Sequence, residues 1–168
     1  MKDRLNIKTL KVIDWNIFIG SESLMNLRES KSLKRRYTLD EIMFSVYTNQ
    51  GTLNVHLDYG FVFDGRSGPS IIDWYAPNLG KITERLSWLA HDVNGYGKSL
   101  SFNDTNTLLF VMLRDMCRYS KLKASTIRYA VSLSRSWYGE PKKNDWCYGN
   151  LNKFIRVEFN TSEIRRAA

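Results

Sequence analysis

The sequence has only two cysteines and no long apolar run, and each of these scarcities excludes a class of protein. Cys117 and Cys147 lie in separate segments without pair spacing, so we predict packed thiols in a reducing compartment rather than a zinc knuckle or a disulfide framework. No segment approaches the ~20 apolar residues that span a bilayer, and the N-terminus lacks the apolar stretch of a signal peptide. We therefore expect an intracellular protein that is not exported by that route.

The hydrophobic and aromatic content indicates a folded chain. Hydrophobic residues make up 43% and aromatic residues 13% of the 168 positions, which is enough to bury a sizeable core. A chain of this length is expected to form one domain over residues 1–168, with its core in 37–160. Residues 1–36 are expected to be an arm or a peripheral segment.

The positive charge is large but dispersed. The chain carries 25 Lys and Arg against 17 Asp and Glu, a net charge of +8. The densest basic stretch holds Arg28, Lys31, Lys34, Arg35 and Arg36. Such a charge attracts anionic partners or nucleic acid, but no helix-turn-helix or zinc-finger spacing accompanies it. A solvated basic face is the alternative interpretation.

Period-two spacing predicts strands in the first half and at the end of the chain. Apolar residues alternate over 10–19 and again on both sides of the Asn49-Gln50-Gly51 turn, which predicts a hairpin from 41 to 58. The stretch 59–63 is expected to extend or bend the second hairpin strand, with a bulge at Gly60. Between 20 and 36 we expect either a short helix around Leu24 and Leu27 or a mobile arm. A last strand is predicted over 153–159.

Helical spacing predicts three helices between the hairpin and the last strand. The first covers about 82–92 and ends at His91 and Asp92. The second runs from 101 to 117 behind a Ser-x-x-acid capping box, and the third begins near Ser125 and ends before Gly139. This order predicts an α+β fold in which an antiparallel sheet packs against about three helices.

The segment 60–69 is the most unusual. Three glycines and a proline surround Asp64 and Ser67, with Gly65 and Arg66 between them. Turns of this composition present side chains and backbone N–H groups at fixed positions, which suits an anion site. The alternative is an Asx turn that only closes a strand.

His91-Asp92 is the second candidate element. An imidazole beside a carboxylate can act as a general base or as a metal ligand, so a divalent metal ion on His91 and Asp92 is one alternative, although no cofactor is specified. A cation at a helix C-terminus is also favoured on its own, and Asp104 has a structural interpretation as the acidic partner of the Ser101 cap.

These residues together resemble a phage and prophage family known only as a domain of unknown function. The resemblance covers roughly residues 55–140, through Gly60-Phe61-x-x-Asp64-Gly65-x-Ser67-x-Pro69, His91-Asp92, Asp104 and Arg128-Tyr-Ala-Val131. It implies a viral origin, a location in the host cytoplasm or the virion, and five shared positions, namely Asp64, Ser67, His91, Asp92 and Asp104. We expect ligand contacts from Gly65, Arg66, Tyr96 and Arg128. Arg66 and Val93-Asn94 depart from the pattern.

Three functions compete. The first is a phage accessory protein with a hydrolytic site on His91, oriented by Asp92 or Asp104, with the 64–67 turn binding the substrate. The second is a non-enzymatic capsid or tail component that binds a phage or host protein, in which the same residues form a structural hydrogen-bond network. The third is a nucleic-acid accessory acting through 28–36. A metal phosphohydrolase that also uses His56 is disfavoured, because His56 falls on a predicted strand. An open cleft joining His91 and Asp64 would favour the enzyme, whereas burial would favour the network.

Overall fold

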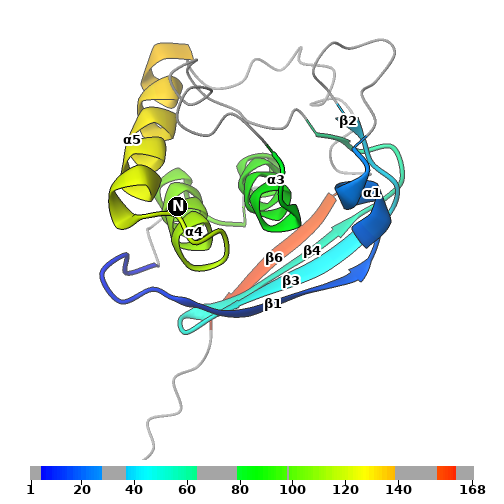
Figure 1. The fold of residues 1–168 in the computed structure, drawn as a ribbon, viewed down its shortest axis with the longest axis horizontal. Helices are drawn as coiled ribbons and strands as arrows, with labels where there is room; N and C mark the ends of the chain where they lie inside the picture. Colours follow the sequence, from blue (N-terminus) through cyan, green and yellow to red (C-terminus); the bar gives the residue numbers. More distant parts are fainter. Residues whose placement is uncertain (1–4, 28–36, 64–78, 98, 139–154, 162–168) are drawn as a thin grey trace, which may run out of the picture.

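The computed structural model describes residues 5–27, 37–63, 79–97, 99–138 and 155–161. Four antiparallel strands form its main sheet, in the order β1 (Val12–Ile19), β3 (Ile42–Thr48), β4 (Gly51–Leu57) and β6 (Ile155–Thr161). Figure 1 shows the three long helices on one side of this sheet. The predicted α+β fold is confirmed, including the last strand, which pairs with β4 along its whole length.

The central hairpin follows the predicted alternation. Phe44 of β3 pairs with Val55 of β4, and both are buried on the side that faces the helices. The turn is closed by Thr48, whose hydroxyl donates to the Gly51 carbonyl oxygen at 2.6 Å and accepts from the Gly51 N–H at 3.0 Å. Alternating side chains on the two strands thus give the sheet one apolar and one polar face.

β1 is the edge strand on the other side of the hairpin. Its register against β3 shifts twice, between Val12 and Asp14 and between Ile17 and Ile19. The bulged residues Ile13 and Phe18 are 69% and 52% exposed. The short helix α1 (Ser21–Met25) follows and buries Leu24 completely, so this stretch forms a helix. The strand and helix show that residues 12–25 belong to the folded body.

The segment after β4 leaves the main sheet. We expected 59–63 to extend or bend β4, and this is wrong, because β5 (Val62–Phe63) pairs with β2 (Tyr37–Thr38) in a separate two-stranded sheet. Gly60 makes the change of direction with a φ of 94°, which glycine adopts without a steric penalty. Its N–H donates to the Leu39 carbonyl oxygen, which brings the two short strands together.

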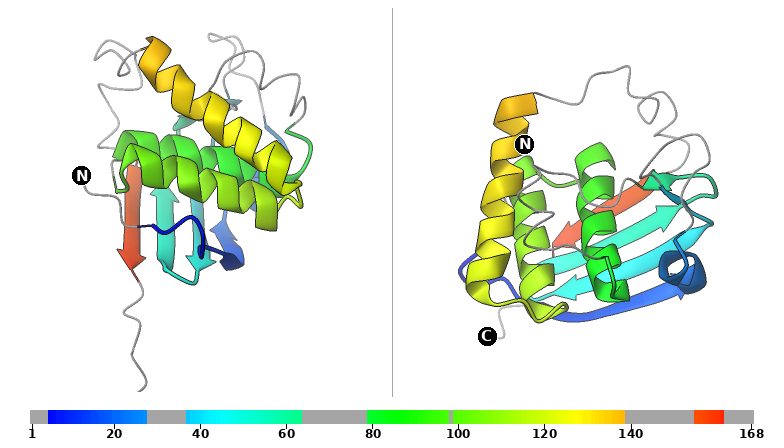
Figure 2. Two further views of the ribbon diagram at one scale, coloured as in Figure 1. Left: turned by 90° about the vertical axis from the view of Figure 1, so that its left-hand side faces the viewer. Right: turned by 45° about the horizontal axis from the view of Figure 1, so that its top comes forward.

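The three long helices are α3 (Ile82–Gly97), α4 (Phe102–Asp115) and α5 (Lys121–Tyr138). α3 contacts β6 and α4 contacts β1, whereas α5 packs against α4 (Figure 2). α4 lies between its two neighbours, and every residue from Asp104 to Leu113 is buried. Among the described residues, no helix has the length and apolarity to cross a membrane.

α3 is longer than predicted. We expected it to end at His91 and Asp92, but it continues to Gly97, so both residues lie within the helix. Asn94, which we expected in a loop, donates its side-chain N–H to the Ala90 carbonyl oxygen and remains helical. Gly97 lies directly on β6, where an added Cβ would be 2.0 Å from Cγ1 of Val157. The absence of a side chain at Gly97 therefore lets the helix end approach the sheet.

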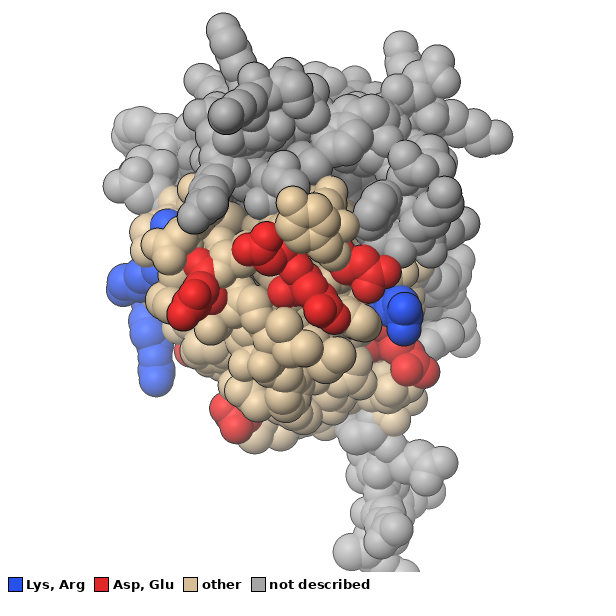
Figure 3. Space-filling model, turned by 90° about the vertical axis from the view of Figure 1, so that its right-hand side faces the viewer, with Lys and Arg blue, Asp and Glu red and all other residues tan. Residues whose placement is uncertain are grey.

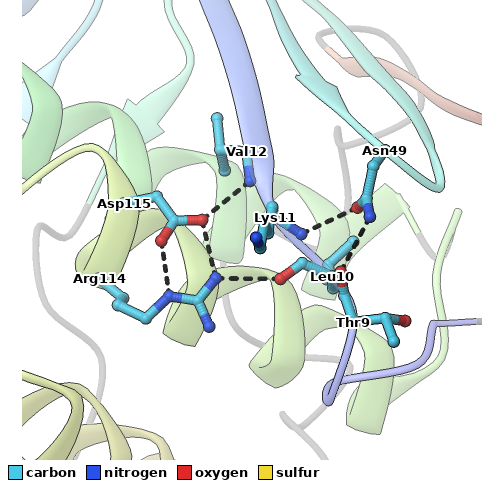
Figure 4. A network of polar contacts seen from close by, with 7 residues as sticks. All are labelled: Thr9, Leu10, Lys11, Val12, Asn49, Arg114 and Asp115. Carbon is cyan, nitrogen blue, oxygen red and sulfur yellow. Dashed lines mark hydrogen bonds and ion pairs between the residues drawn. The ribbon is translucent and has the colours of Figure 1, made fainter.

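Polar contacts fasten the chain before β1 to the rest of the fold (Figure 4). Asp115 accepts from the Val12 N–H at 2.9 Å, and Arg114 donates to the Leu10 carbonyl oxygen at 3.0 Å. Asn49 of the hairpin turn accepts from the Lys11 N–H and donates to the Thr9 carbonyl oxygen. These bonds join the start of β1 to the end of α4 and to the β3–β4 turn.

Candidate functional site

His91 projects from the middle of α3 toward α4, and its side chain is only 10% exposed. Its Nε2 lies 3.0 Å from Oδ1 of Asn106, and its Nδ1 lies 3.4 Å from Oδ1 of Asp92. The ring of Trp88 stands edge-on to it at 6.1 Å between centroids. Both ring nitrogens therefore face oxygen atoms, and an imidazole with hydrogen on both nitrogens can donate to each.

The hydrogen bonds continue from His91 across two more helices. Asn106 is 1% exposed, and its Nδ2 donates to Oγ of Ser132 at 3.3 Å. The Ser132 hydroxyl donates in turn to the Arg128 carbonyl oxygen at 2.8 Å. We call the four residues His91, Asp92, Asn106 and Ser132 the interhelix network. It links α3 to α4 through His91 and Asn106, and α4 to α5 through Asn106 and Ser132.

Arg128 lies beside this network on α5. Its Nη2 is 3.4 Å from the Thr107 hydroxyl, and its Nε is buried without a hydrogen-bond partner among the described residues. The Thr105 hydroxyl is likewise buried without a hydrogen-bond partner among the described residues. Arg128 therefore lies at the interface between α5 and α4, whereas His91 lies at the interface between α3 and α4.

Asp104 takes part in the predicted Ser101 cap through its backbone N–H. Ser101 is the N-cap of α4, and its Oγ accepts from the Asp104 N–H at 3.1 Å. The Asp104 carboxylate accepts from the Leu5 N–H at 2.9 Å while the residue is 1% exposed. Asp104 thus ties the N-terminal segment to the start of α4.

The other predicted site residues are beyond what the structure describes. Asp64, Gly65, Arg66 and Ser67 lie outside the described residues, and Tyr96 is placed only as a residue of α3. The expected approach of the 64–67 turn to His91 stays a prediction. Of the predicted site residues, His91 and Asp92 lie side by side on α3. Arg128 lies on α5 and contacts Thr107 of α4.

Sequence reasoning missed Asn106 and Ser132. The signal in the sequence was the run Asp104-Thr105-Asn106-Thr107 at the start of a helix that is otherwise apolar, and all four residues are buried. Buried polar side chains require partners, so such a run indicates a polar contact between helices. The partners on α3 and α5 become evident only in the fold.

A second cluster, also missed, surrounds the other histidine. His56 of β4 places Nε2 at 2.7 Å from Oε1 of Glu41 and at 3.6 Å from Oδ1 of Asp58. The His56 side chain is 22% exposed, and those of Glu41 and Asp58 are 49% and 40% exposed. Both carboxylates thus lie at the surface, at the end of the sheet next to α1.

Neither the cysteine nor the acidic side chains build a recognisable metal centre here. Within the described ranges, no group of three or more His, Cys, Asp or Glu side chains is arranged to hold a metal ion. Cys117 is buried, 3.6 Å from the Ser87 hydroxyl, and burial raises the pKa of its thiol. The predicted packing of Cys117 as a thiol is confirmed.

Comparisons with known proteins returned no matching family model, no similar curated protein and no similar solved structure. The resemblance to the phage family stays a prediction that rests on the motif residues.

Proposed function

We propose that this chain is a non-enzymatic accessory component of a phage particle or its assembly, and that it acts by binding a partner protein. One observation carries the proposal. His91, the best candidate for a catalytic base, is nearly buried, and both of its ring nitrogens face side chains that fix it in the interhelix network.

The physical reason is the accessibility of the base. A general base must reach the proton that it removes, either directly or through one water molecule. The Nε2 of His91 is instead 3.0 Å from Asn106, which itself continues the bonds to Ser132. A buried polar network of this kind fixes how helices pack, because burying a polar group has a desolvation cost that its hydrogen bonds offset. The network therefore suits a structural role.

The phage context of the proposal comes from the motif resemblance. The alternative, a hydrolytic enzyme, has a structural requirement of its own. That alternative needs the 64–67 turn to bind a substrate beside His91. It predicts turnover that depends on His91, which the binding proposal does not.

The experiment combines stability with activity. In His91→Ala, the buried Asn106 and Asp92 lose a partner, and we expect the free energy of unfolding to fall by about 2–4 kcal/mol in urea titrations. His91→Gln keeps an amide that can donate to Asn106 and should recover part of that loss. Ester, phosphodiester and peptidoglycan substrates, with and without divalent metals, should show no turnover by the unmodified chain. Turnover that disappears in a His91→Ala protein of normal stability would overturn the proposal.

A further inference from the structure

The end of the sheet next to α1 carries an acidic surface that is separate from the interhelix network. We call Glu22, Asp40, Glu41 and Asp58, together with the exposed Ile19, Met25 and Tyr59, the acidic face. Figure 3 shows Asp and Glu side chains gathered on this side of the molecule, with Lys and Arg at its margins.

Contacts between three separate segments bring these residues together. The Asp40 N–H donates to the Ser23 hydroxyl of α1 at 3.1 Å, and Ile19 pairs with Met43 of β3. Glu41 and Asp58 are joined through His56. The approach is close at Gly20, where an added Cβ would lie 2.2 Å from the Glu41 carbonyl oxygen. The end of β1, the start of β3 and the end of β4 therefore form one surface.

In the part of the chain that the structure describes, basic side chains do not balance the charge of the acidic face. Within the described residues, no Lys or Arg lies at ion-pair distance from any of the four carboxylates, and His56 is the partner that two of them share. This occurs in a chain whose net charge is +8. Carboxylates on so basic a protein ordinarily have many cations available, so four carboxylates without a Lys or Arg partner among the described residues are a distinct local feature.

Apolar side chains accompany the charges. Ile19 is 42%, Met25 51% and Tyr59 71% exposed, and these are three of the seven large hydrophobic residues that stand out from the described surface. Aromatic and methionine side chains are enriched where proteins bind partners, and a polar rim around them is typical of such interfaces. The combination of exposed apolar and acidic side chains selects a partner of opposite charge with apolar residues of its own.

We infer that the acidic face is a docking surface for a basic segment of a partner protein, in which Lys or Arg residues alternate with apolar ones. The inference rests on the proposed function, because it names the chemistry of the partner. The partner contacts side chains rather than the backbone of β1. That edge is interrupted by two bulges, and the Trp15 N–H is already bound by the Asp14 carboxylate at 2.8 Å.

A short synthetic peptide that alternates Lys with Leu tests the inference on the full chain. It should bind despite the positive net charge of the protein, and binding should weaken steeply as salt is raised. A peptide that alternates Glu with Leu is the control and should not bind. Isothermal titration and fluorescence anisotropy measure both.

Variants locate the binding. Asp40→Asn, Glu41→Gln and Asp58→Asn combined should weaken peptide binding by about tenfold or more, and Tyr59→Ser by about threefold, given the strength of exposed charge pairs and rim contacts. Asp14→Asn is the matched control, because it removes one exposed carboxylate elsewhere on the sheet and its amide oxygen still accepts from Trp15. It should leave binding unchanged.

Two outcomes would overturn the inference. One is peptide binding that responds equally to Asp14→Asn and to the acidic-face variants. The other is self-association of the unmodified chain that the same variants abolish, since the occupant would then be a second copy. Neither outcome depends on the His91 experiments, so failure here leaves the non-enzymatic proposal intact.

Discussion

The two histidines of this chain have opposite surroundings. His91 is 10% exposed where α3 packs against α4, and its Nε2 contacts a neutral amide that continues a chain of hydrogen bonds. His56 is 22% exposed at the end of the sheet, between two carboxylates that are themselves well exposed. A polar group that is buried fixes how elements pack, whereas charges left in solvent remain available to a partner. The comparison supports the proposed division, in which the helix interface stabilises the fold and the sheet end binds a partner.

The largest expected effect is at the helix interface. Asn106→Ala removes the amide that contacts His91 and Ser132. The imidazole of His91 and the hydroxyl of Ser132 then lose this hydrogen-bond partner. We expect the free energy of unfolding to fall by about 2–3 kcal/mol in urea titrations. Asn160→Ala on the exposed side of β6 is the control and should change it by less than about 0.5 kcal/mol. Equal effects of the two substitutions would remove the distinction between interior and surface.

A glycine pair on α3 tests how tightly the helix layer meets the sheet. Gly97→Ala places a Cβ against Val157 of β6, and we expect a loss of about 1–3 kcal/mol from overpacking. Gly95→Ala meets nothing within 4 Å and should stabilise by up to about 1 kcal/mol, because alanine favours the helix. Thermal unfolding measures both, and hydrogen exchange of β6 amides reports where the strain falls. A neutral Gly97→Ala would contradict the close approach.

The Asp115 contact gives a pH-dependent prediction. Burial alone would raise the pKa of this carboxyl, but hydrogen bonds from Arg114 and from the Val12 N–H outweigh it and hold the pKa below its usual value. The carboxylate therefore stabilises the fold above its ordinary pKa, and the contribution is lost as pH falls through the lowered value.

The matching variant is Asp115→Asn. We expect it to cost about 1–2 kcal/mol at neutral pH and progressively less as the medium becomes acidic, because the unmodified chain then loses its own charge. Denaturant titrations at several pH values measure the difference between the two proteins. A difference that grows toward acid pH would show that the sign is wrong.

The smallest effect is expected at the other histidine. His56→Ala removes a surface ion pair with Glu41, and such pairs contribute about 0–1 kcal/mol. The free energy of unfolding should change by less than about 0.5 kcal/mol, well below the effect of His91→Ala. A loss at His56 as large as that at His91 would show that the comparison of the two sites is mistaken.

The fold was largely predictable because its signals are local. Alternating residues identified β3 and β4, and the Ser101 cap with its apolar stripe identified α4. The prediction failed where tertiary contacts override local signals. The apolar spacing predicted that α3 ends at His91 and Asp92, but the helix continues to Gly97, which packs on β6.

The candidate site was predicted only in part. His91, Asp92 and Asp104 were selected by residue type and by the motif, whereas Asn106 and Ser132 reach His91 through contacts between helices that have no fixed spacing in sequence. The acidic face is non-local as well, since Glu22, Asp40 and Asp58 come from three separate segments. Patterns along the chain describe elements, and only the packed arrangement describes surfaces.

The position of β6 in the sheet constrains how the protein is made. β6 completes the sheet beside β4, yet all three long helices are synthesised between these two strands. Pairing of such distant segments has a large loop-closure cost, so it is slow compared with hairpin and helix formation. On the ribosome, the β4 edge and the apolar side chains that β6 covers stay exposed until residues 155–161 have emerged. Aggregation of nascent chains, and any benefit from a chaperone, should therefore concentrate in that interval.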